Sequence, residues 1–565
     1  MLDELAALAR IRGHAHDTSL FAKAAGLVRS AGIESDGGLA PLLAAPPPGT
    51  DPDILRQLRY MYEAGGWVLV ESAIADLPAD LRWLLESDAV TIEQLAVLHV
   101  ALGVTSAPDV HEAVRRGAVR EVAGFAERAE AAIARALPTL RASIPRVPLG
   151  RATAMTEPML ARLRALPGVV WAEPAGSLRR GQDTVGDIEI VASTTAPDGA
   201  FDALIADSPD AKCLHRGRER LYLRIDRVQV GIRCPDPGVA GAVLLSMTGA
   251  PAHLAQLRDL AVTTGQRLGP DGLVSAAGDT RGAGTEEEIY AGLGLPWIPP
   301  EIRHGDEELD RARTGALVPL VGGGDIRGDL HMHTEYSDGR DTVAAMVEAS
   351  VALGYEYMAI TDHSPHSAAS RNLSADSVKR QADEIAGLRE RFPQIAILHG
   401  CEVDILANGR LDFSDRILER FDMVLASLHE GLGHSPARLL ERYMAAVQHP
   451  LVNIVTHPSN RLVSHRAGYE IDFERLFTEA VATGTALEVD GAPIHLDMDG
   501  ALARRAVAAG AMIVVDSDSH RAEMLGRQMR LGLTTARRGW VEPRHVLNTR
   551  PLAGVRAFVA AKRSR

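Results

Sequence analysis

Residues 328–363 read GDLHMHTEYSDGRDTVAAMVEASVALGYEYMAITDH, and this stretch decides how the second half of the chain folds. A short strand is followed by a polar loop, a helix with regularly spaced apolar residues and a second strand. The same order recurs to the end of the chain, with strands expected at 328–333, 355–363, 395–404, 421–429, 451–457, 485–490 and 511–520. Seven such β/α units predict a parallel barrel over 327–565.

Imidazole and carboxylate side chains gather at the ends of these strands. The candidates are His331, His333, Asp338, His363, Glu402, His429, His457, Asp518 and His520. The C-terminal strand ends of a barrel converge on one mouth, so these nine side chains are expected to face one bowl. Their nitrogen and oxygen atoms suit Zn, Mn or Fe, and nine ligands suit two or three ions. Clustered divalent ions are typical of phosphoester hydrolysis.

Other polar residues near the strand ends have less certain roles. Arg461 is a candidate phosphate clamp, with a solvated arginine as the equal alternative. Asp490, at the end of the sixth strand, is ambiguous. The remaining histidines of the second half are interpreted as surface or supporting residues, and they are His366, His399, His434, His449, His465, His495 and His545.

Composition indicates an ordinary globular protein. The 565 residues allow three or four domains, and 46% are hydrophobic and 24% charged. A run long enough to span a membrane is absent from the sequence, and the N-terminus has no apolar segment typical of a secretory signal. Three widely separated cysteines fit a reducing cytoplasm. The net charge of −14 argues against coating nucleic acid by bulk charge, but it leaves room for a local basic groove.

The first half is organised differently. Residues 1–145 carry helical apolar spacing, as in DILRQLRYMYEAG (53–65) and TIEQLAVLHVALG (91–103). Residues 150–300 mix helices with strands, and RERLYLRI and RVQVGIR (218–233) predict a hairpin. The Pro- and Gly-rich stretch from 296 to 330 is typical of a linker.

The motifs HMHTEYSDG, AITDHS, GCEVDIL, ASLH, THPSNRL and VDSDSH together resemble the polymerase and histidinol phosphatase (PHP) domain. That resemblance covers about 325–565. It implies a distorted seven-stranded barrel with a trinuclear metal site. The nine candidate ligands are the residues that it assigns to the metals, and none is missing.

The first half resembles the bacterial family X DNA polymerases, chiefly through AGSLRRGQDTVGDIEIV (175–191). The resemblance implies that Gly176, Ser177 and Arg180 bind a nucleotide. It also implies that Asp187 and Glu189, two apart on one strand, hold Mg in a two-metal nucleotidyl-transfer site. The domains that it implies are an α-helical N-terminal domain (1–75), a degenerate helix–hairpin–helix region (76–148), an α+β nucleotidyltransferase palm with thumb (149–300), a linker (301–326) and the PHP barrel (327–565).

Departures from the polymerase pattern affect functional positions. The third catalytic carboxylate of the family is expected on VQVGIR, where Gly231 stands and offers no ligand atom. A Tyr-Phe-Thr-Gly segment reads Ser246-Met247-Thr248-Gly249, and the glycine pairs of the DNA-binding hairpins are lost. No lysine lies between Lys23 and Lys212, so a Schiff-base lyase lacks an obvious nucleophile there.

The sequence therefore predicts a cytoplasmic DNA-repair protein with an intact metal-dependent phosphoesterase and an impaired or vestigial polymerase half. The expected reaction is 3′→5′ exonuclease action or cleaning of DNA 3′ ends. Three alternatives stay open: a phosphatase acting on a small phosphomonoester, a working gap-filling polymerase that recruits another carboxylate such as Asp226, and a DNA-end binding module without catalysis. The metal identity, the preferred DNA structure and the oligomeric state are not predicted.

Overall fold

The computed structural model describes residues 2–11, 14–33, 39–64, 84, 89–104, 107–143, 146–186, 188–209, 211–225, 228–269, 271–275, 278, 280–281, 283–367, 371–431 and 433–565. The chain forms two compact units. Unit 1 comprises 1–146, 162–171 and 186–235, and unit 2 comprises 147–161, 172–185 and 236–565. Within these described ranges, no helix is long and apolar enough to cross a membrane.

Unit 1 begins with helices that share one apolar core. They are α1 (Leu2–Ile11), α2 (Ala15–Ser30), α3 (Leu39–Ala44), α4 (Pro52–Ala64), α7 (Ile92–Leu102), α8 (Ala107–Arg115), the 3-10 turn η2 (Val119–Glu121) and α9 (Glu127–Ser143). The helical character predicted for residues 1–145 is confirmed for the residues of this region that the structure describes. In α7, Thr91 and Gln94 form a capping box at the start, and Gly103 ends the helix in the left-handed conformation.

The sheet of unit 1 has the strand order β2-β4-β7-β6-β5. Its strands are β2 (Val169–Pro174), β4 (Ile188–Thr194), β5 (Lys212–Arg216), β6 (Arg220–Ile225) and β7 (Val228–Arg233), with α12 (Pro197–Asp207) after β4. β6 and β7 pair antiparallel, which confirms the predicted hairpin. β4 and β7 pair in parallel and bring Glu189 opposite Gly231.

Unit 2 begins with short elements followed by a helical subdomain. These are β1 (Val147–Pro148), α10 (Leu149–Arg164), α11 (Gly176–Arg179), β3 (Thr184–Val185), α13 (Ala240–Thr248), α14 (Pro251–Thr263), β8 (Gln266–Gly269), β9 (Gly272–Ser275), β10 (Thr280–Arg281) and α15 (Glu286–Gly292). β1 pairs with β3, and β8 to β10 form an antiparallel sheet.

The stretch predicted as a linker, 301–326, is folded and packed. It contains α16 (Glu308–Arg313) and the 3-10 turns η3 (Pro300–Ile302) and η4 (Gly323–Asp325). Arg303 is fully buried and holds Glu286 through two guanidinium nitrogens. The Pro- and Gly-rich composition therefore marks turns that a buried ion pair anchors, which the local sequence pattern does not reveal.

The remainder of unit 2 is a seven-stranded parallel barrel, as predicted. Its strands follow chain order: β11 (Gly328–Asp329), β12 (Tyr357–Ile360), β13 (Ala396–Asp404), β14 (Met423–Ser427), β15 (Ile454–Val455), β16 (Ala486–Asp490) and β17 (Ile513–Asp516). A parallel bridge between Met332 and Ser519 joins the first strand region to the last and nearly closes the barrel.

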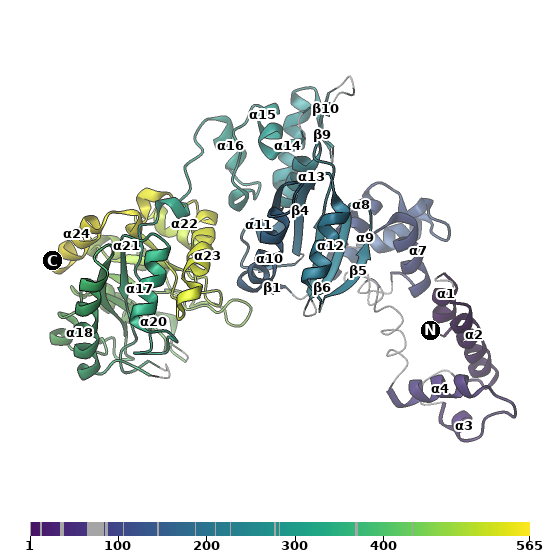
Figure 1. The fold of residues 1–565 in the computed structure, drawn as a ribbon, viewed down its shortest axis with the longest axis horizontal. Coiled ribbons are helices and arrows are strands. Elements are labelled where there is room, and N and C mark those ends of the chain that lie inside the picture. Colours follow the sequence, from purple (N-terminus) through teal and green to yellow (C-terminus); the bar gives the residue numbers. More distant parts are fainter. Residues whose placement is uncertain are drawn as a thin grey trace. The chain divides into compact units, whose positions relative to one another are not determined.

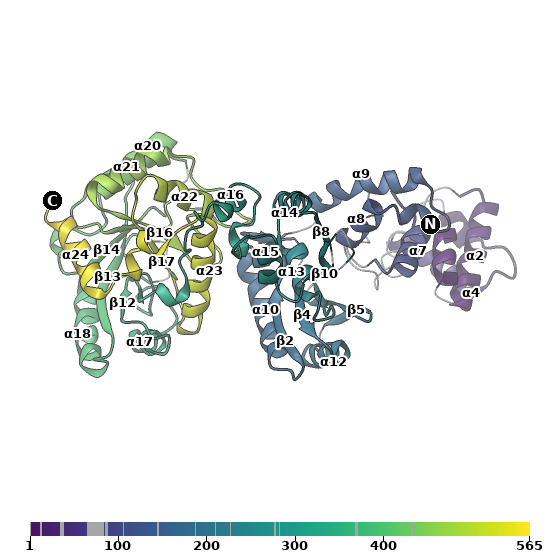
Figure 2. The ribbon, with the colours of Figure 1, turned by 90° about the horizontal axis from the view of Figure 1, so that it is seen from above.

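Helices surround these strands in both views (Figure 1, Figure 2). They are α17 (Val343–Ala352), α18 (Ala375–Arg391), α19 (Asp415–Leu418), α20 (Pro436–Gln448), α21 (Phe473–Thr483), α22 (Gly500–Ala508), α23 (Leu525–Arg538) and α24 (Leu552–Arg563), with 3-10 turns η5 (Ala522–Met524), η6 (Pro543–His545) and η7 (Leu547–Thr549). Ser435, Asp472 and Asp499 cap α20, α21 and α22 by accepting backbone N–H groups.

Alternation along the strands separates the outer core from the interior. Val403 and Val489 belong to the apolar core that includes Tyr443 of α20. Leu425 and Ile454 belong to a second core. Val555 and Val559 of α24 and Leu547 of η7 complete that core, which lies around the strand starts. Because α24 covers the strand starts, the polar inward positions lie at the opposite end.

Candidate metal centre

The predicted ligands are carried by the C-terminal ends of the barrel strands and the loops that follow them. His331 and His333 follow β11, Asp338 lies in the next loop, His363 follows β12, Glu402 lies in β13, His429 follows β14, His457 follows β15, and Asp518 and His520 follow β17. The parallel register and the inward alternation bring all nine to one end of the barrel. His363 and Glu402 even form a parallel bridge between neighbouring strand ends.

Glu402 is the centre of this cluster. Its Oε2 lies 2.8 Å from His363 Nδ1, and its Oε1 lies 3.0 Å from His457 Nε2. The Nε2 atoms of three further histidines lie 3.5 Å from its carboxylate, and they belong to His331, His333 and His429. One buried carboxylate thus faces five imidazole rings, an arrangement suited to a ligand that bridges cations.

The side chains form overlapping groups of the size that one metal ion requires. Within each group, ligand atoms lie within 4.8 Å of one another. The groups are His333–Asp338–His363–His520, His331–His333–Asp518 and His363–Glu402–His429. Because they share members, the geometry fits several adjacent ions better than a single tetrahedral one.

The chemistry of the cluster also fits bound cations. Among the described residues, four buried atoms here make no hydrogen bond of normal geometry: Asp338 Oδ1, His363 Nδ1, Glu402 Oε2 and His457 Nδ1. The Nε2 atoms of His331 and His333 lie 3.0 Å apart. Buried polar atoms without hydrogen bonds are costly, and a cation would satisfy them.

Outer carboxylates orient the imidazole rings. Glu488, buried in β16, lies 2.6 Å from His331 Nδ1, and Asp404 lies 2.9 Å from His429 Nδ1. These contacts place the proton of the neutral ring on Nδ1 and leave the Nε2 lone pair for a metal. Sequence reasoning missed both carboxylates, although their inward positions in TALEVD and GCEVD could have revealed them.

Electrostatics favour protonation of three histidines of the cluster, whereas burial, His363 and His520 lower the pKa of His333 to about 4. Burial opposes protonation of His331, but Glu488, Asp518 and Glu402 together raise its pKa well above the ordinary value. Burial also opposes protonation of His457 and His520, yet facing carboxylates raise the pKa of each to about 9. The same negative field would attract divalent cations, which compete with these protons.

Comparison with known proteins agrees with this architecture. The PHP domain model matches residues 329–483, and the DNA polymerase beta thumb model matches 243–304. The DNA polymerase/3′-5′ exonuclease PolX of Bacillus subtilis is 34% identical over 495 residues, which cover 87% of this chain and 86% of that protein. The chain belongs to the PolX family.

Two further comparisons match smaller shares of the chain. A probable phosphatase of Syntrophotalea carbinolica is 31% identical over 29% of this chain and 64% of its own length. A solved histidinol phosphate phosphatase from Lactococcus lactis, complexed with zinc, L-histidinol and phosphate, is 18% identical. It covers 38% of this chain and 94% of its own, with a TM-score of 0.31.

Arg461 does not stand free as a phosphate clamp. Its Nη1 lies 2.7 Å from Asp183 Oδ2, and its Nε lies 3.1 Å from the carbonyl oxygens of His495 and Leu496. Arg538 also pairs with Asp183. The geometry therefore favours an anchoring role for Arg461, which ties the loop after β16 to residue 183 within unit 2.

The polymerase-like carboxylates lie in unit 1. Asp187 and Asp226 are outside the described residues. Glu189 is nearly buried, and a Cβ atom built at Gly231 would lie 2.5 Å from both Glu189 carboxylate oxygens. The Glu189 side chain thus occupies the space that a carboxylate at position 231 would need.

An arginine flanks this PolX carboxylate. Arg233 Nε lies 3.6 Å from Glu189 Oε2, and its Nη2 lies 3.1 Å from Asp109 and 3.2 Å from the Tyr222 hydroxyl. Burial works against the charged guanidinium, but Tyr222, Glu189 and Asp109 outweigh it and raise the pKa of Arg233. A fixed positive charge therefore lies beside Glu189, which is described by the structure whereas its predicted partner Asp187 is not.

The predicted nucleotide-binding residues belong to unit 2. Gly176 opens the short α11 with φ +63°, and the carbonyl of Ser177 accepts the Gln182 N–H at 2.9 Å. Arg180 Nη1 donates to the Thr248 carbonyl at 2.6 Å. The arginine is therefore engaged with the end of α13, and nucleotide binding by these three residues stays a prediction.

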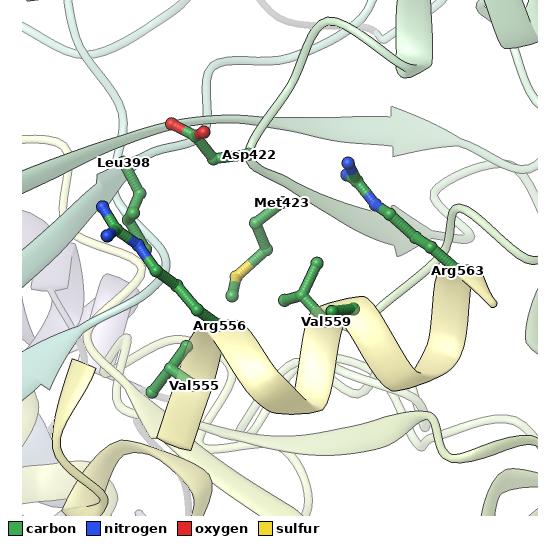
Figure 3. Close-up of a pocket in the computed structure, with 8 residues that line it drawn as sticks. Leu398, Asp422, Met423, Val555, Arg556, Val559 and Arg563 are labelled. Carbon is green, nitrogen blue, oxygen red and sulfur yellow. The ribbon is translucent and has the colours of Figure 1, made fainter. Parts of the chain in front are cut away.

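A separate cavity of about 220 Å³ lies at the other end of the barrel. Figure 3 shows Arg556, Val559 and Arg563 on α24 facing Met423 and Asp422. None of its lining residues is a candidate ligand. The candidate ligands lie instead at the mouth of the barrel, where the strands end.

Proposed function

We propose that the barrel hydrolyses phosphodiester bonds at DNA 3′ ends with two or three divalent ions, drawn from Zn, Mn or Fe. The observation that carries the proposal is the convergence of nine imidazole and carboxylate side chains, among which Glu402 faces five imidazole rings. The ligands would be His331, His333, Asp338, His363, Glu402, His429, His457, Asp518 and His520. When bound, such ions lower the pKa of a water ligand and neutralise charge on the phosphate.

The residues of the chain contribute position and proton placement. Glu488 and Asp404 hold the rings of His331 and His429 with Nε2 directed to the cluster. The barrel wall keeps Glu402 and His331 away from solvent, which strengthens their interaction with charge at the mouth. The relationship to a PolX polymerase/3′-5′ exonuclease supports DNA as the substrate, and action in the cytoplasm is part of the proposal.

We further propose that the polymerase half is impaired. Gly231 supplies no carboxylate, and the adjacent Glu189 is close to the Arg233 guanidinium. The positive charge of Arg233 would compete with a metal ion, because both would bind the Glu189 carboxylate. Losing a metal ligand is costly for two-metal chemistry, so little nucleotidyl transfer is expected.

A second candidate is hydrolysis of a small phosphomonoester. It is favoured by the similarity of part of the chain to a probable phosphatase. The salt dependence of substrate binding distinguishes the two candidates. Binding of DNA to basic side chains releases counterions, so the affinity for DNA falls steeply as the salt concentration rises.

The test uses the purified full chain and a 5′-labelled primer annealed to a longer template, with Mn²⁺. The wild-type protein is expected to shorten the primer, and the His331→Ala/His333→Ala double variant is not. His465→Ala, an exposed histidine outside the cluster, is the matched control and should shorten the primer as the wild type does. Shortening by the double variant would contradict the assignment of hydrolysis to the barrel site. Phosphate release from p-nitrophenyl phosphate without any DNA hydrolysis would contradict DNA as the substrate. Primer lengthening on addition of dNTPs would contradict the impaired polymerase.

A further inference from the structure

A second donor group adjoins the predicted cluster and includes two residues outside the nine predicted ligands. Asp490 ends β16, His495 lies in the following loop, and Asp518 follows β17. One ligand atom from each of the three lies within 4.8 Å of the other two. In tetrahedral Zn²⁺ coordination two ligand atoms stand about 3.3–3.6 Å apart, so the three donors would move together by up to about 1.5 Å to bind one ion.

One carboxylate oxygen of Asp490 has no hydrogen-bond partner among the described residues. Its side chain is completely buried, and its Oδ1 accepts the Ala492 N–H at 2.6 Å. Its Oδ2 is also buried and makes no hydrogen bond in the described part of the chain. A buried carboxylate oxygen without a partner is costly, and a cation beside it would remove that cost.

His495 is held in the tautomer that a ligand requires. Its Nδ1 lies 3.2 Å from the Arg461 carbonyl oxygen, which can only accept, so Nδ1 carries the ring proton. The lone pair is then on Nε2. The ring also stacks on His457, with centroids 5.3 Å apart and planes 17° apart. Arg461 fixes the loop further by donating to the carbonyls of His495 and Leu496.

Asp518 can serve both groups. Its contacts with His331, His333 and His520 all use Oδ1, at 3.5, 3.1 and 3.8 Å. A carboxylate has two oxygens, so Asp518 can contact one ion of each group. A carboxylate that bridges two cations in this way is usual where metals are clustered.

We infer that Asp490, His495 and Asp518 form an additional binding site for a divalent transition-metal ion, adjacent to the ions of the predicted cluster and sharing Asp518 with them. One imidazole with two carboxylates suits Mn²⁺, Fe²⁺ or Zn²⁺ better than Ca²⁺, which takes oxygen ligands. The inference rests on the proposed metal centre only for the orientation of Asp518. An ion here would add positive charge at the edge of the mouth, where an anionic substrate enters.

The test is metal localisation in crystals of the full chain soaked with Mn²⁺ or Zn²⁺, using anomalous scattering. We expect peaks around Glu402 and one further peak between Asp490, His495 and Asp518. Peaks around Glu402 without the further peak would overturn this inference and leave the proposed function intact. Absence of peaks around Glu402 would overturn the proposed function, and a peak bound by Asp490 and His495 would still decide the present inference.

Metal analysis of variants supplies an independent readout. His495→Ala is expected to bind one ion fewer per chain than the wild type, and Asp490→Asn, which keeps the shape of the side chain, should show the same loss. His465→Ala is the matched control and should bind as many ions as the wild type. An unchanged metal content in both His495→Ala and Asp490→Asn would overturn the inference. If either variant unfolds, the anomalous map of the wild-type protein decides alone.

Discussion

Replacing Glu488 by glutamine tests how the barrel orients its metal ligands. In the wild-type protein, Oε1 of Glu488 lies 2.6 Å from His331 Nδ1, and Oε2 accepts the backbone N–H of His457 at 2.7 Å. Glu488 is the acceptor in both hydrogen bonds, and its side chain is completely buried. Glutamine has one acceptor oxygen and one NH₂ group, so it cannot accept both hydrogen bonds.

Each orientation of the glutamine amide carries a penalty. If its oxygen faces His331, the NH₂ group opposes the His457 N–H, and a buried donor without a partner costs about 1–3 kcal/mol. If its NH₂ group faces His331, Nδ1 must become the acceptor. The ring proton then moves to Nε2, which can no longer bind a metal. Loss of such an orienting carboxylate reduces metal affinity about 10- to 100-fold, or about 1.4–2.7 kcal/mol.

The assay is a competition titration of Zn²⁺ or Mn²⁺ between the full chain and a coloured chelator, with thermal melting to verify folding. Glu356→Gln is the matched control, because Glu356 is exposed and pairs with Arg327 rather than with the cluster. We expect weakened binding of at least one ion in Glu488→Gln and unchanged binding in Glu356→Gln. Equal affinities in Glu488→Gln and the wild type would refute the orienting role of Glu488.

Two further predictions concern other parts of the chain. Gly231→Asp alone is expected to destabilise the protein by about 1–3 kcal/mol in chemical denaturation, because its Cβ would lie 2.5 Å from the Glu189 oxygens. Adding Glu189→Asp should restore part of the lost unfolding free energy, because the shorter side chain moves the carboxylate away from position 231. No restoration would contradict a steric cause of the destabilisation. In unit 2, burial acts to raise the pKa of Glu286, but Arg303 and Arg179 outweigh it and lower that pKa to about 2, against 4.5 in the unfolded chain. The ionised form therefore stabilises the fold fully above pH 4.5, and about 3 kcal/mol of this is lost as the pH falls toward 2. The difference in unfolding free energy between the wild type and Glu286→Gln should shrink over that range, and a constant difference would be the opposing result.

The barrel and the convergence of its ligands could be predicted from the sequence, because both depend on local patterns. The alternation of side chains along a strand and the position of the strand end together determine that His363, Glu402 and His429 face the mouth of the barrel. The role of Arg461 could not be predicted, since its partner Asp183 lies 278 positions away along the chain. The buried ion pair of Arg303 and Glu286 was missed for a different reason, because the Pro- and Gly-rich composition around Arg303 resembles that of a linker.

The loop after β16 shows a different limit of sequence reasoning. His495 lies five residues beyond the end of the strand, and Leu496 beside it adopts a left-handed backbone conformation with φ +44°. Such a conformation is rare for a residue with a branched side chain and is set by tertiary contacts. Neither the spacing of His495 nor its residue type could therefore indicate that it lies against His457.

Removing the bound metal and adding it back shows whether primer shortening depends on the cations of the barrel. The full chain would be stripped with a chelator, dialysed and titrated with Mn²⁺, while bound metal and shortening of the labelled primer are measured on the same samples. The account predicts that shortening disappears with the metal and returns in proportion to the ions rebound. It also predicts that binding weakens as the pH falls, since the pKa values of His457 and His520 are raised to about 9 and protons compete with the cations. Primer shortening at full rate by the metal-free protein would contradict the account.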